Sequence, residues 1–326
     1  MPDITLTTLD AAPPDLIEHL LERELESWMS ELGWDYTLVC RILLSFIRRR
    51  ALPGFAAIDS RSAAGYTYFL VHGTKGVIGT VYRAGTDVSH SIVDSLQNAA
   101  IDSLQANPKI RRIEAQVMPF HDVDLTAVFE RRGFECHPRH FLQMDLNALG
   151  PRRCREVRES LIAWNPCHLE EAARVAQLGY RNQIDAHICA DYGSEAGCLG
   201  FLRSLIETPG CGTFLPLGSF EALDDSGRPC GFIIVSRISA TGAMIPQISI
   251  SPAHQGHGIG KALMDAALHA LAAQGYKTVA LAVTATNRRA CEWYLRLGFR
   301  VRKSFSACLW QAPAVSLARA AASPSV

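Results

Sequence analysis

The fold of this chain is decided by residues 248–262, which read ISISPAHQGHGIGKA. An apolar run typical of a strand ends at Ile250, and glycines follow at positions 256, 258 and 260. From Gly258 to Ala273 the apolar residues recur at helical spacing. This order predicts a strand, then a glycine loop, then a helix that begins directly at the loop.

A strand, glycine loop and helix in this order favour the binding of an anion. The first backbone N–H groups of a helix have no acceptor within the helix, and the helix dipole places partial positive charge there. Glycine residues let a ligand approach the backbone without a side chain in the way. We therefore expect a phosphate site for a nucleotide, a dinucleotide or coenzyme A.

Two familiar phosphate motifs do not fit this loop. The Walker motif needs Gly-Lys-Ser/Thr, but Lys261 is followed by Ala262, and the first glycine of the motif is replaced by Gln255. The dinucleotide motif needs a third glycine where Lys261 stands, and an acidic residue at the end of the next strand, which residues 279–284 lack. Both nucleotide classes are therefore disfavoured.

The loop does resemble the pyrophosphate loop of GNAT acetyltransferases, whose pattern is Q/R-x-x-G-x-G/A. Here the letters are QGHGIG, residues 255–260. Residues 287–299 resemble the second cofactor helix of that family, N-x-x-A-x-x-x-Y-x-x-x-G-F, at every fixed position. One helix and one strand separate the two motifs, as in the family. The resemblance covers about residues 165–310 and implies an α/β fold with a sheet flanked by helices.

The resemblance implies transfer of an acetyl group from acetyl-CoA to an amine. Tyr294 is expected to protonate the departing thiolate as a general acid, and Asn287 to contact the cofactor arm. A backbone N–H group of the strand before the loop is expected to stabilise the oxyanion. The other implied cofactor-binding residues are Ile248, Ser249 and Ile250 on the strand, and Gln255, Gly256, His257, Gly258, Ile259, Gly260 and Lys261 through their backbone N–H groups.

The general base stays open at this stage. A lysine-like amine is protonated at neutral pH, so it must lose a proton before it attacks. Gln247 stands near where some relatives place a glutamate, but an amide is not a base. The alternatives are a chain of waters or one of the residues Asp185, His187, Asp191, Glu195 and Glu221. Residues 180–198, where the family usually builds its acceptor pocket, have an acidic and aromatic content that suits a cationic amine.

The N-terminal half repeats the C-terminal half in outline. Residues 129–134 read FERRGF and match YLRLGF at 294–299, which indicates duplication of one α/β domain. The first copy has a single glycine in its loop, with Asp87 beside it, and Phe129 where the tyrosine is expected. We therefore predict a degenerate GNAT-like domain over 1–150 with a structural or acceptor-binding role, an active GNAT domain over 151–311, and a disordered tail over 312–326.

The periodicity of apolar residues predicts the remaining elements. Helices are expected over 16–32, 34–49, 89–104, 125–132, 169–178, 194–206, 258–273 and 288–297. Strands are expected over 55–59, 66–72, 76–82, 110–117, 140–146, 219–222, 229–238, 244–250 and 278–283, with closing strands within 299–310.

The composition is that of an ordinary globular protein. Thirty-two basic residues balance 32 acidic ones over 326 residues, so nothing in the net charge favours a nucleic acid or an anionic membrane. No apolar run is long enough to span a bilayer, and the ten scattered cysteines form no C-x-x-C pair, so we expect reduced thiols and a cytoplasmic location. His254 and His257 are expected to face solvent, and no metal is expected.

The expected partner is an amine-bearing small molecule, a peptide or a protein, and the chain is expected to be a monomer or a homodimer. Two other functions stay open. One is a regulatory module that binds acetyl-CoA without turnover, against which the intact Tyr294 argues. The other is an acyltransferase with a different donor, such as another acyl-CoA or an aminoacyl-tRNA.

Overall fold

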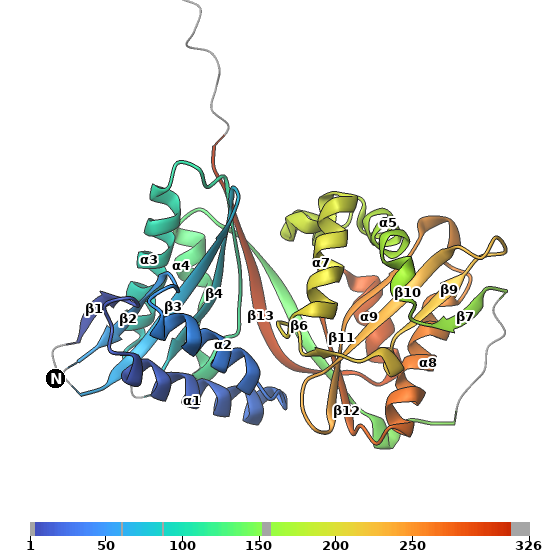
Figure 1. Ribbon diagram of the computed structural model, residues 1–326, viewed down its shortest axis with the longest axis horizontal. Coiled ribbons are helices and arrows are strands. Elements are labelled where there is room, and N and C mark those ends of the chain that lie inside the picture. The colour runs from blue at the N-terminus through green and yellow to red at the C-terminus, as the bar shows by residue number, and fades with distance from the viewer. Residues whose placement is uncertain (1–3, 60, 87, 152–157, 314–326) are drawn as a thin grey trace, which may run out of the picture.

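A computed structural model describes residues 4–313, apart from 60, 87 and 152–157 (Figure 1). Most of the predicted tail over 312–326 lies outside these residues, as does Asp87. The helices are α1 Pro14–Leu32, α2 Thr37–Arg48, α3 His90–Ala106, α4 Thr126–Arg131, α5 Leu169–Tyr180, α6 Ile184–Ile188, α7 Glu195–Glu207, α8 Ile259–Ala273 and α9 Arg288–Leu297. The strands are β1 Thr5–Thr8, β2 Gly54–Ile58, β3 Ala63–His72, β4 Lys75–Arg83, β5 Arg112–Val117, β6 Glu135–Asp145, β7 Ser160–Ala163, β8 Thr213–Phe214, β9 Phe220–Leu223, β10 Pro229–Arg237, β11 Gly242–Ile250, β12 Thr278–Thr284 and β13 Arg300–Gln311.

Every predicted helix and strand is present, with ends that differ by a few residues. The largest differences concern the closing strands, because β6 begins at Glu135 rather than His140 and residues 300–311 form one strand instead of several. The short elements β1, β7, β8 and α6 were not predicted. Elements of two to five residues are too short to show a period of two or 3.6.

The fold is α/β: a large mixed sheet with helices on both faces. In each half, two helices cover one face and two cover the other, and separate apolar clusters fill the layers between them. Buried residues on these helices include Leu20, Leu43, Leu96, Val175, Leu202 and Leu263. Each half therefore buries apolar residues on both faces of its part of the sheet, as the apolar spacing of its helices predicts.

Parallel strands part at the same point in both halves. β11 pairs with β12 only from Gly242 to Met244, and its register against β10 then shifts at a bulge that contains Pro246, a residue with no N–H to donate. β4 pairs with β5 from Lys75 to Ile78, and its bulge falls at Gly79. The same bulge and divergence therefore occur at corresponding places in the two halves.

The last strand of each half lies beside the other half. β6 lies between β12 and β13, and β13 lies between β5 and β6. In Figure 1 these two long strands run together through the middle of the molecule, one green and one red. The two halves therefore share a continuous sheet, in which β6 continues the C-terminal half and β13 the N-terminal half. The boundary at 150/151 stays a prediction about the order of residues along the chain. In space, β6 and β13 each pair with a strand from the other side of that boundary.

The exchange brings two cysteines together. Cys136 of β6 and Cys308 of β13 are opposite one another in the antiparallel register, with Cα atoms 4.1 Å apart, and their sulfurs form a disulfide. The prediction that the cysteines are reduced thiols is therefore wrong for this pair. They are 172 residues apart in sequence, and only the pairing of β6 with β13 places them side by side.

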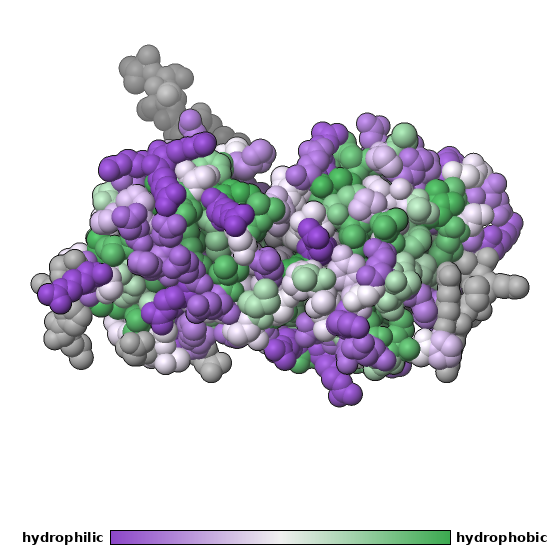
Figure 2. Space-filling view, turned by 60° about the horizontal axis from the view of Figure 1, so that its bottom comes forward, coloured by the Kyte–Doolittle hydropathy of each residue, from purple (hydrophilic) through white to green (hydrophobic). Residues whose placement is uncertain are grey.

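The surface is mixed in character. Figure 2 shows hydrophilic and hydrophobic residues interspersed over both halves on the visible face. Among the described residues, no helix has both the length and the apolar composition that crossing a bilayer requires.

Candidate active site

The loop before α8 has the conformation that its glycines predict. Gly256 and Gly258 have φ angles of 86° and 91°, a left-handed region that other residues adopt at a cost. Gly258 is the N-cap of α8 and has no side-chain oxygen with which to cap the helix. The glycines therefore shape the turn and also leave the start of α8 uncapped.

The backbone N–H groups at this turn are free for a ligand. The N–H group of Ala262 donates to the carbonyl of Gly258 at 3.0 Å, and that of Gln255 donates to the carbonyl of Pro252 at 3.3 Å. Between them, the N–H groups of residues 256–261 have no acceptor among the described residues. Because the positive end of the helix dipole lies here, these donors form a site for an anion.

The loop lies open to solvent. A hollow of about 610 Å³ beside it is lined by Arg158, Glu159, Asp224, Asp225, Ser226, Ala253, His254 and His257. His257 is exposed, whereas His254 is half-buried and its Nδ1 shares a hydrogen bond of 2.8 Å with Ser251 Oγ. The predicted solvent-facing position therefore applies to His257 and only in part to His254.

The strand before the loop offers an unpaired edge. Ile248, Ser249 and Ile250 pair with β10 on one side, but the parallel pairing with β12 has already ended at Met244. Alternate backbone groups of a strand point to opposite edges, so part of this stretch faces the gap. The side-chain amide of Gln255 donates to the carbonyl of Ile250 at 3.1 Å and ties the loop to the strand.

The start of α8 also lies close to α9. A Cβ atom on Gly260 would lie 3.7 Å from Ile250 Cδ1 and 3.9 Å from Trp293 Cη2, both ordinary contact distances. The end of β11, the glycine loop and α9 therefore meet at one place. The two motifs read separately from the sequence form one site.

Tyr294 is buried on the inner face of α9. Its ring packs edge-on against Phe299, with centroids 5.9 Å apart, and beside Trp293. Burial raises the pKa of the Tyr294 hydroxyl well above its usual value, and the nearby ionisable side chains of Tyr180 and Asp185 raise it further. The hydroxyl therefore holds its proton at neutral pH, as a proton donor must.

Asn287 begins α9. Its side-chain oxygen accepts a hydrogen bond of 3.2 Å from the N–H group of Ala290, which is the geometry of a helix N-cap. Its Nδ2 donates to no described residue. The Asn287 side chain can therefore cap α9 and still donate to a cofactor arm, and that contact stays a prediction.

An aromatic wall stands at the mouth of the gap between β11 and β12. Tyr180, at the end of α5, stacks on Tyr192 with centroids 4.0 Å apart. The Tyr192 hydroxyl donates to Gln247 Oε1 at 3.0 Å. Gln247 is 2% exposed. Burial raises the pKa of Tyr180 to about 12, and a hydrogen bond with the Gln247 side chain opposes that rise, so Gln247 of β11 contacts both tyrosines.

Asp185 of α6 lies at the same mouth. Its Oδ1 accepts a hydrogen bond of 2.7 Å from Thr284 Oγ1, at the end of β12. The Arg139 guanidinium lies 3.9 Å from the same oxygen. Arg139 belongs to β6, so the N-terminal half contributes a charged group to this site.

The other candidate bases have partners elsewhere. Glu221 is fully buried against His168, at 2.7 Å. Asp191 pairs with Lys75 at 3.0 Å. Glu195 pairs with Arg174 at 3.1 Å and His187 with Glu135 at 2.9 Å. Of the carboxylates named from the sequence, the structure brings Asp185 to the site.

Sequence reasoning missed four residues of this site. Tyr180 and Tyr192 belong to the aromatic segment 180–198, which was predicted as the acceptor region, but nothing singled them out. Thr284 ends a predicted strand and shows no motif. Arg139 has no sequence signal at all, because only the exchange of β6 brings it here.

Side chains occupy the corresponding place in the N-terminal half. Arg83 ends β4 as Ile250 ends β11, and it is buried, donating to the carbonyls of Val88 at 2.8 Å and His121 at 2.7 Å. Its guanidinium therefore joins the first loop to the 3-10 turn Phe120–Asp122 that follows β5. Ser89 caps α3 with its own hydroxyl.

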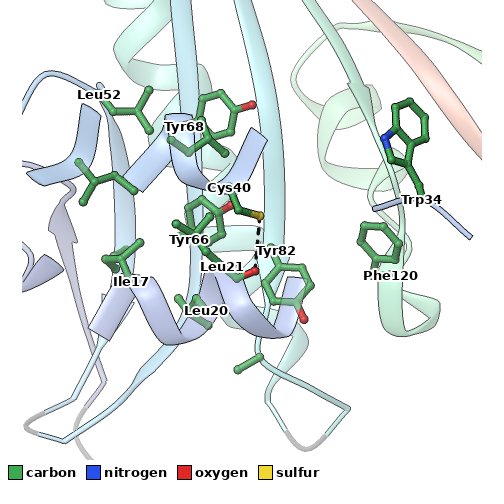
Figure 3. Close-up of a cluster of buried hydrophobic side chains, with 14 of the residues drawn as sticks. Ile17, Leu20, Leu21, Trp34, Cys40, Leu52, Tyr66, Tyr68, Tyr82 and Phe120 are labelled. Carbon is green, nitrogen blue, oxygen red and sulfur yellow. Dashed lines mark hydrogen bonds between the residues drawn. The ribbon is translucent and has the colours of Figure 1, made fainter. Parts of the chain in front are cut away.

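Figure 3 shows the buried tyrosines, Tyr66, Tyr68 and Tyr82, that pack beneath α1 and α2 in this half.

These features define a class of protein. A sheet whose parallel strands part at a bulge, an uncapped glycine turn beside the open edge, and a buried tyrosine on the following helix together form the GNAT arrangement. The model of the acetyltransferase (GNAT) family matches residues 183–299. The C-terminal part of the chain therefore belongs to the GNAT family.

Solved structures of similar fold cover nearly the whole chain. A GCN5-related N-acetyltransferase from Sphaerobacter thermophilus superposes with a TM-score of 0.69 at 15% identity, over 95% of this chain and 96% of that one. A tandem GNAT protein from the clavulanic acid biosynthesis pathway gives 0.64 at 15% identity, over 96% and 100%. The fold is thus that of a tandem GNAT protein.

A curated relative matches part of the sequence more closely. Mycothiol acetyltransferase from Gordonia bronchialis is 35% identical over 111 residues, which cover 33% of this chain. The match spans about a third of that relative's own length, 36%.

Proposed function

We propose that this chain is an N-acetyltransferase that moves an acetyl group from acetyl-CoA to an amine. One observation carries the proposal. The free N–H groups of residues 256–261 lie beside the unpaired edge of β11, so one continuous surface offers donors for a pyrophosphate and for an extended arm. The buried Tyr294 on the neighbouring helix adds a proton donor.

The residues present fit acetyl-CoA. Gly256, His257, Gly258, Ile259, Gly260 and Lys261 would hold the pyrophosphate through their N–H groups. The N–H group of Gln255 already has an acceptor, so its contribution is the side-chain tie to Ile250. Ile248, Ser249 and Ile250 would hold the pantetheine arm, with Asn287 beside it. When bound, the thioester supplies the acetyl group.

Two side chains would move protons during transfer. Tyr294 would protonate the thiolate that leaves, since its raised pKa keeps it protonated. Asp185 would take the proton of the amine, directly or through water, because it is the carboxylate at the mouth of the gap. A backbone N–H group at the open edge of β11 would stabilise the oxyanion.

The aromatic wall of Tyr180 and Tyr192, together with Asp185, suits a cationic amine on a small molecule, a peptide or a protein. In this proposal residues 151–311 form the active domain. Residues 1–150 support the acceptor side, since Arg139 reaches it from β6. A cytoplasmic location and a monomeric or homodimeric state remain predictions from the sequence.

Gly260→Asp tests the cofactor assignment. The new carboxylate would stand among the free N–H groups, where it stabilises the helix but repels a pyrophosphate. Because a Cβ atom at Gly260 meets only ordinary contacts, the variant should fold. We expect its Kd for acetyl-CoA, measured by calorimetry on the full chain, to rise at least about tenfold, or about 1.4 kcal/mol.

Gly200→Asp is the matched control, because Gly200 is also helical and a Cβ atom there would have no neighbour within 4 Å. It should bind acetyl-CoA like the wild type. If the wild type does not bind acetyl-CoA, or if Gly260→Asp binds it unchanged, the proposal is wrong.

A further inference from the structure

Three potential metal ligands meet at the seam between the two halves. Glu135 and His137 lie two residues apart on β6, so they share one face of the strand, while Cys136 between them points to the other face and bonds Cys308. His187 comes from α6 of the C-terminal half. Two imidazoles and a carboxylate from distant segments thus converge on one point.

The distances among these groups suit a single ion. The Glu135 Oε2 atom is 2.9 Å from His187 Nε2 and 3.9 Å from His137 Nε2. The three ligand atoms all lie within 4.8 Å of one another. In a tetrahedral zinc site with metal–ligand bonds of about 2.0–2.1 Å, ligand atoms stand roughly 3.3 Å apart. Small rotations of these side chains would therefore complete a site.

The hydrogen bonds within the cluster leave one atom unused. His187 and Glu135 bond to each other, whereas His137 Nε2 is buried and has no hydrogen-bond partner among the described residues. A buried polar atom without a hydrogen-bond partner is uncommon in a native structure, so a bound ion or water is expected beside it. This nitrogen faces the other two ligand atoms, which is where an ion would bind.

The backbone that carries His187 is held in place. Arg112 of β5 donates to the carbonyls of His187 at 2.6 Å and of Ile188 at 3.0 Å. Its positive charge is compensated by a short hydrogen bond and ion pair with Glu114. The Arg112 guanidinium therefore fixes the position of the helix that carries His187, and its own charge is paired with Glu114.

We propose that Glu135, His137 and His187 bind a divalent transition-metal ion of the zinc type. Two imidazole nitrogens and one carboxylate oxygen are ligands that Zn²⁺ accepts, with water completing the shell. The ion would join β6 to α6. Because Asp185 lies on the same short helix as His187, the metal would fix the helix that carries the carboxylate of the acceptor site.

The test uses the full-length chain, freed of metal with a chelator, in a Cys167→Ser background because Cys167 is an exposed thiol. Zn²⁺ is titrated in competition with a chromophoric chelator, and Co²⁺ is followed by its visible absorption. We expect one equivalent to bind and to raise the melting temperature. His187→Ala and Glu135→Gln, both at exposed side chains, should each weaken binding at least about tenfold and abolish the thermal shift.

His140→Ala is the matched control, since this histidine is also on β6 but bonds Ser304 instead. It should bind Zn²⁺ like the wild type. The proposal is overturned if the wild type binds no Zn²⁺ at micromolar concentrations. It is equally overturned if His187→Ala and Glu135→Gln, shown by circular dichroism to be folded, bind it as tightly as the wild type.

Discussion

At the scale of single residues, burial sets the chemistry of Tyr294. A tyrosine in water is already a weak acid, and the apolar contacts with Phe299 and Trp293 make its ionised form still less favourable. The same burial that keeps the proton on the hydroxyl also removes competing water.

Tyr294→Phe should remove the proton donor while preserving the ring that packs in the core. We expect kcat to fall about 100-fold, a typical contribution of general acid catalysis, with the Kd for acetyl-CoA unchanged. The measurement is steady-state acetylation of an amine acceptor together with calorimetry. A variant with wild-type kcat would show that Tyr294 is not the general acid.

The pH profile of the wild type follows from the same residue. Since the pKa of Tyr294 is raised above its ordinary 10.0, the protonated form persists at every pH below that value and is lost only above it. Loss of this proton should therefore cause no fall in rate below about pH 10, which a pH–rate profile checks. A fall at lower pH that disappears in Tyr294→Phe would contradict the raised pKa.

At the scale of elements, the start of α8 depends on a residue without a side chain. Gly258 adopts a left-handed conformation, caps nothing, and leaves the next N–H groups to a ligand. α3 in the N-terminal half shows the alternative, because Ser89 caps it and Arg83 occupies the space. The same strand, loop and helix are therefore uncapped at α8 and closed by side chains at α3.

Gly258→Ala should strain the turn, at about 1–2 kcal/mol of stability, and lower the affinity for acetyl-CoA. Gly275→Ala is its matched control, because Gly275 lies just after the other end of α8 with a φ angle of 84° and open space around it. Both variants should lose similar stability in thermal unfolding, and only Gly258→Ala should bind acetyl-CoA more weakly. Equal affinities in the two variants would contradict the position of the cofactor.

At the scale of the whole molecule, the N-terminal half contacts residues 187–191, which lie within the predicted acceptor region. Glu114 accepts a hydrogen bond of 3.0 Å from the N–H group of Ala190, and Lys75 pairs with Asp191. Arg112 holds the carbonyls at the end of α6. The N-terminal half therefore contacts the end of α6 and the residues after it through three side chains.

Arg112→Gln should loosen this segment without touching the cofactor loop. We expect the KM for the amine to rise roughly three- to tenfold, because the lost hydrogen bonds would weaken amine binding by about 1 kcal/mol of free energy. The Kd for acetyl-CoA should be unchanged. Arg111→Gln is the neighbouring control, since Arg111 donates to the carbonyl of Pro313 instead. An unchanged KM in Arg112→Gln would rule out this supporting role.

The sequence by itself determined the local part of this protein. Spacing and backbone preference act over a few residues. They predict the turn at Gly256 and Gly258, the helix that follows it, and the second helix, which ends before Gly298 and Phe299. The loop turns as they predict, and α9 begins at Asn287 and ends at Gly298 as its motif indicates.

Only the tertiary structure decided what depends on strands from distant parts of the chain. The exchange of β6 and β13 brings Arg139 beside Asp185, joins Cys136 to Cys308 and gathers Glu135, His137 and His187. Both closing strands follow similar helices and carry similar patterns, so the sequence does not say which neighbour each will pair with. The pairing of β6 and β13 is determined by hydrogen bonds and packing between residues more than a hundred positions apart. Local backbone preferences therefore cannot predict it.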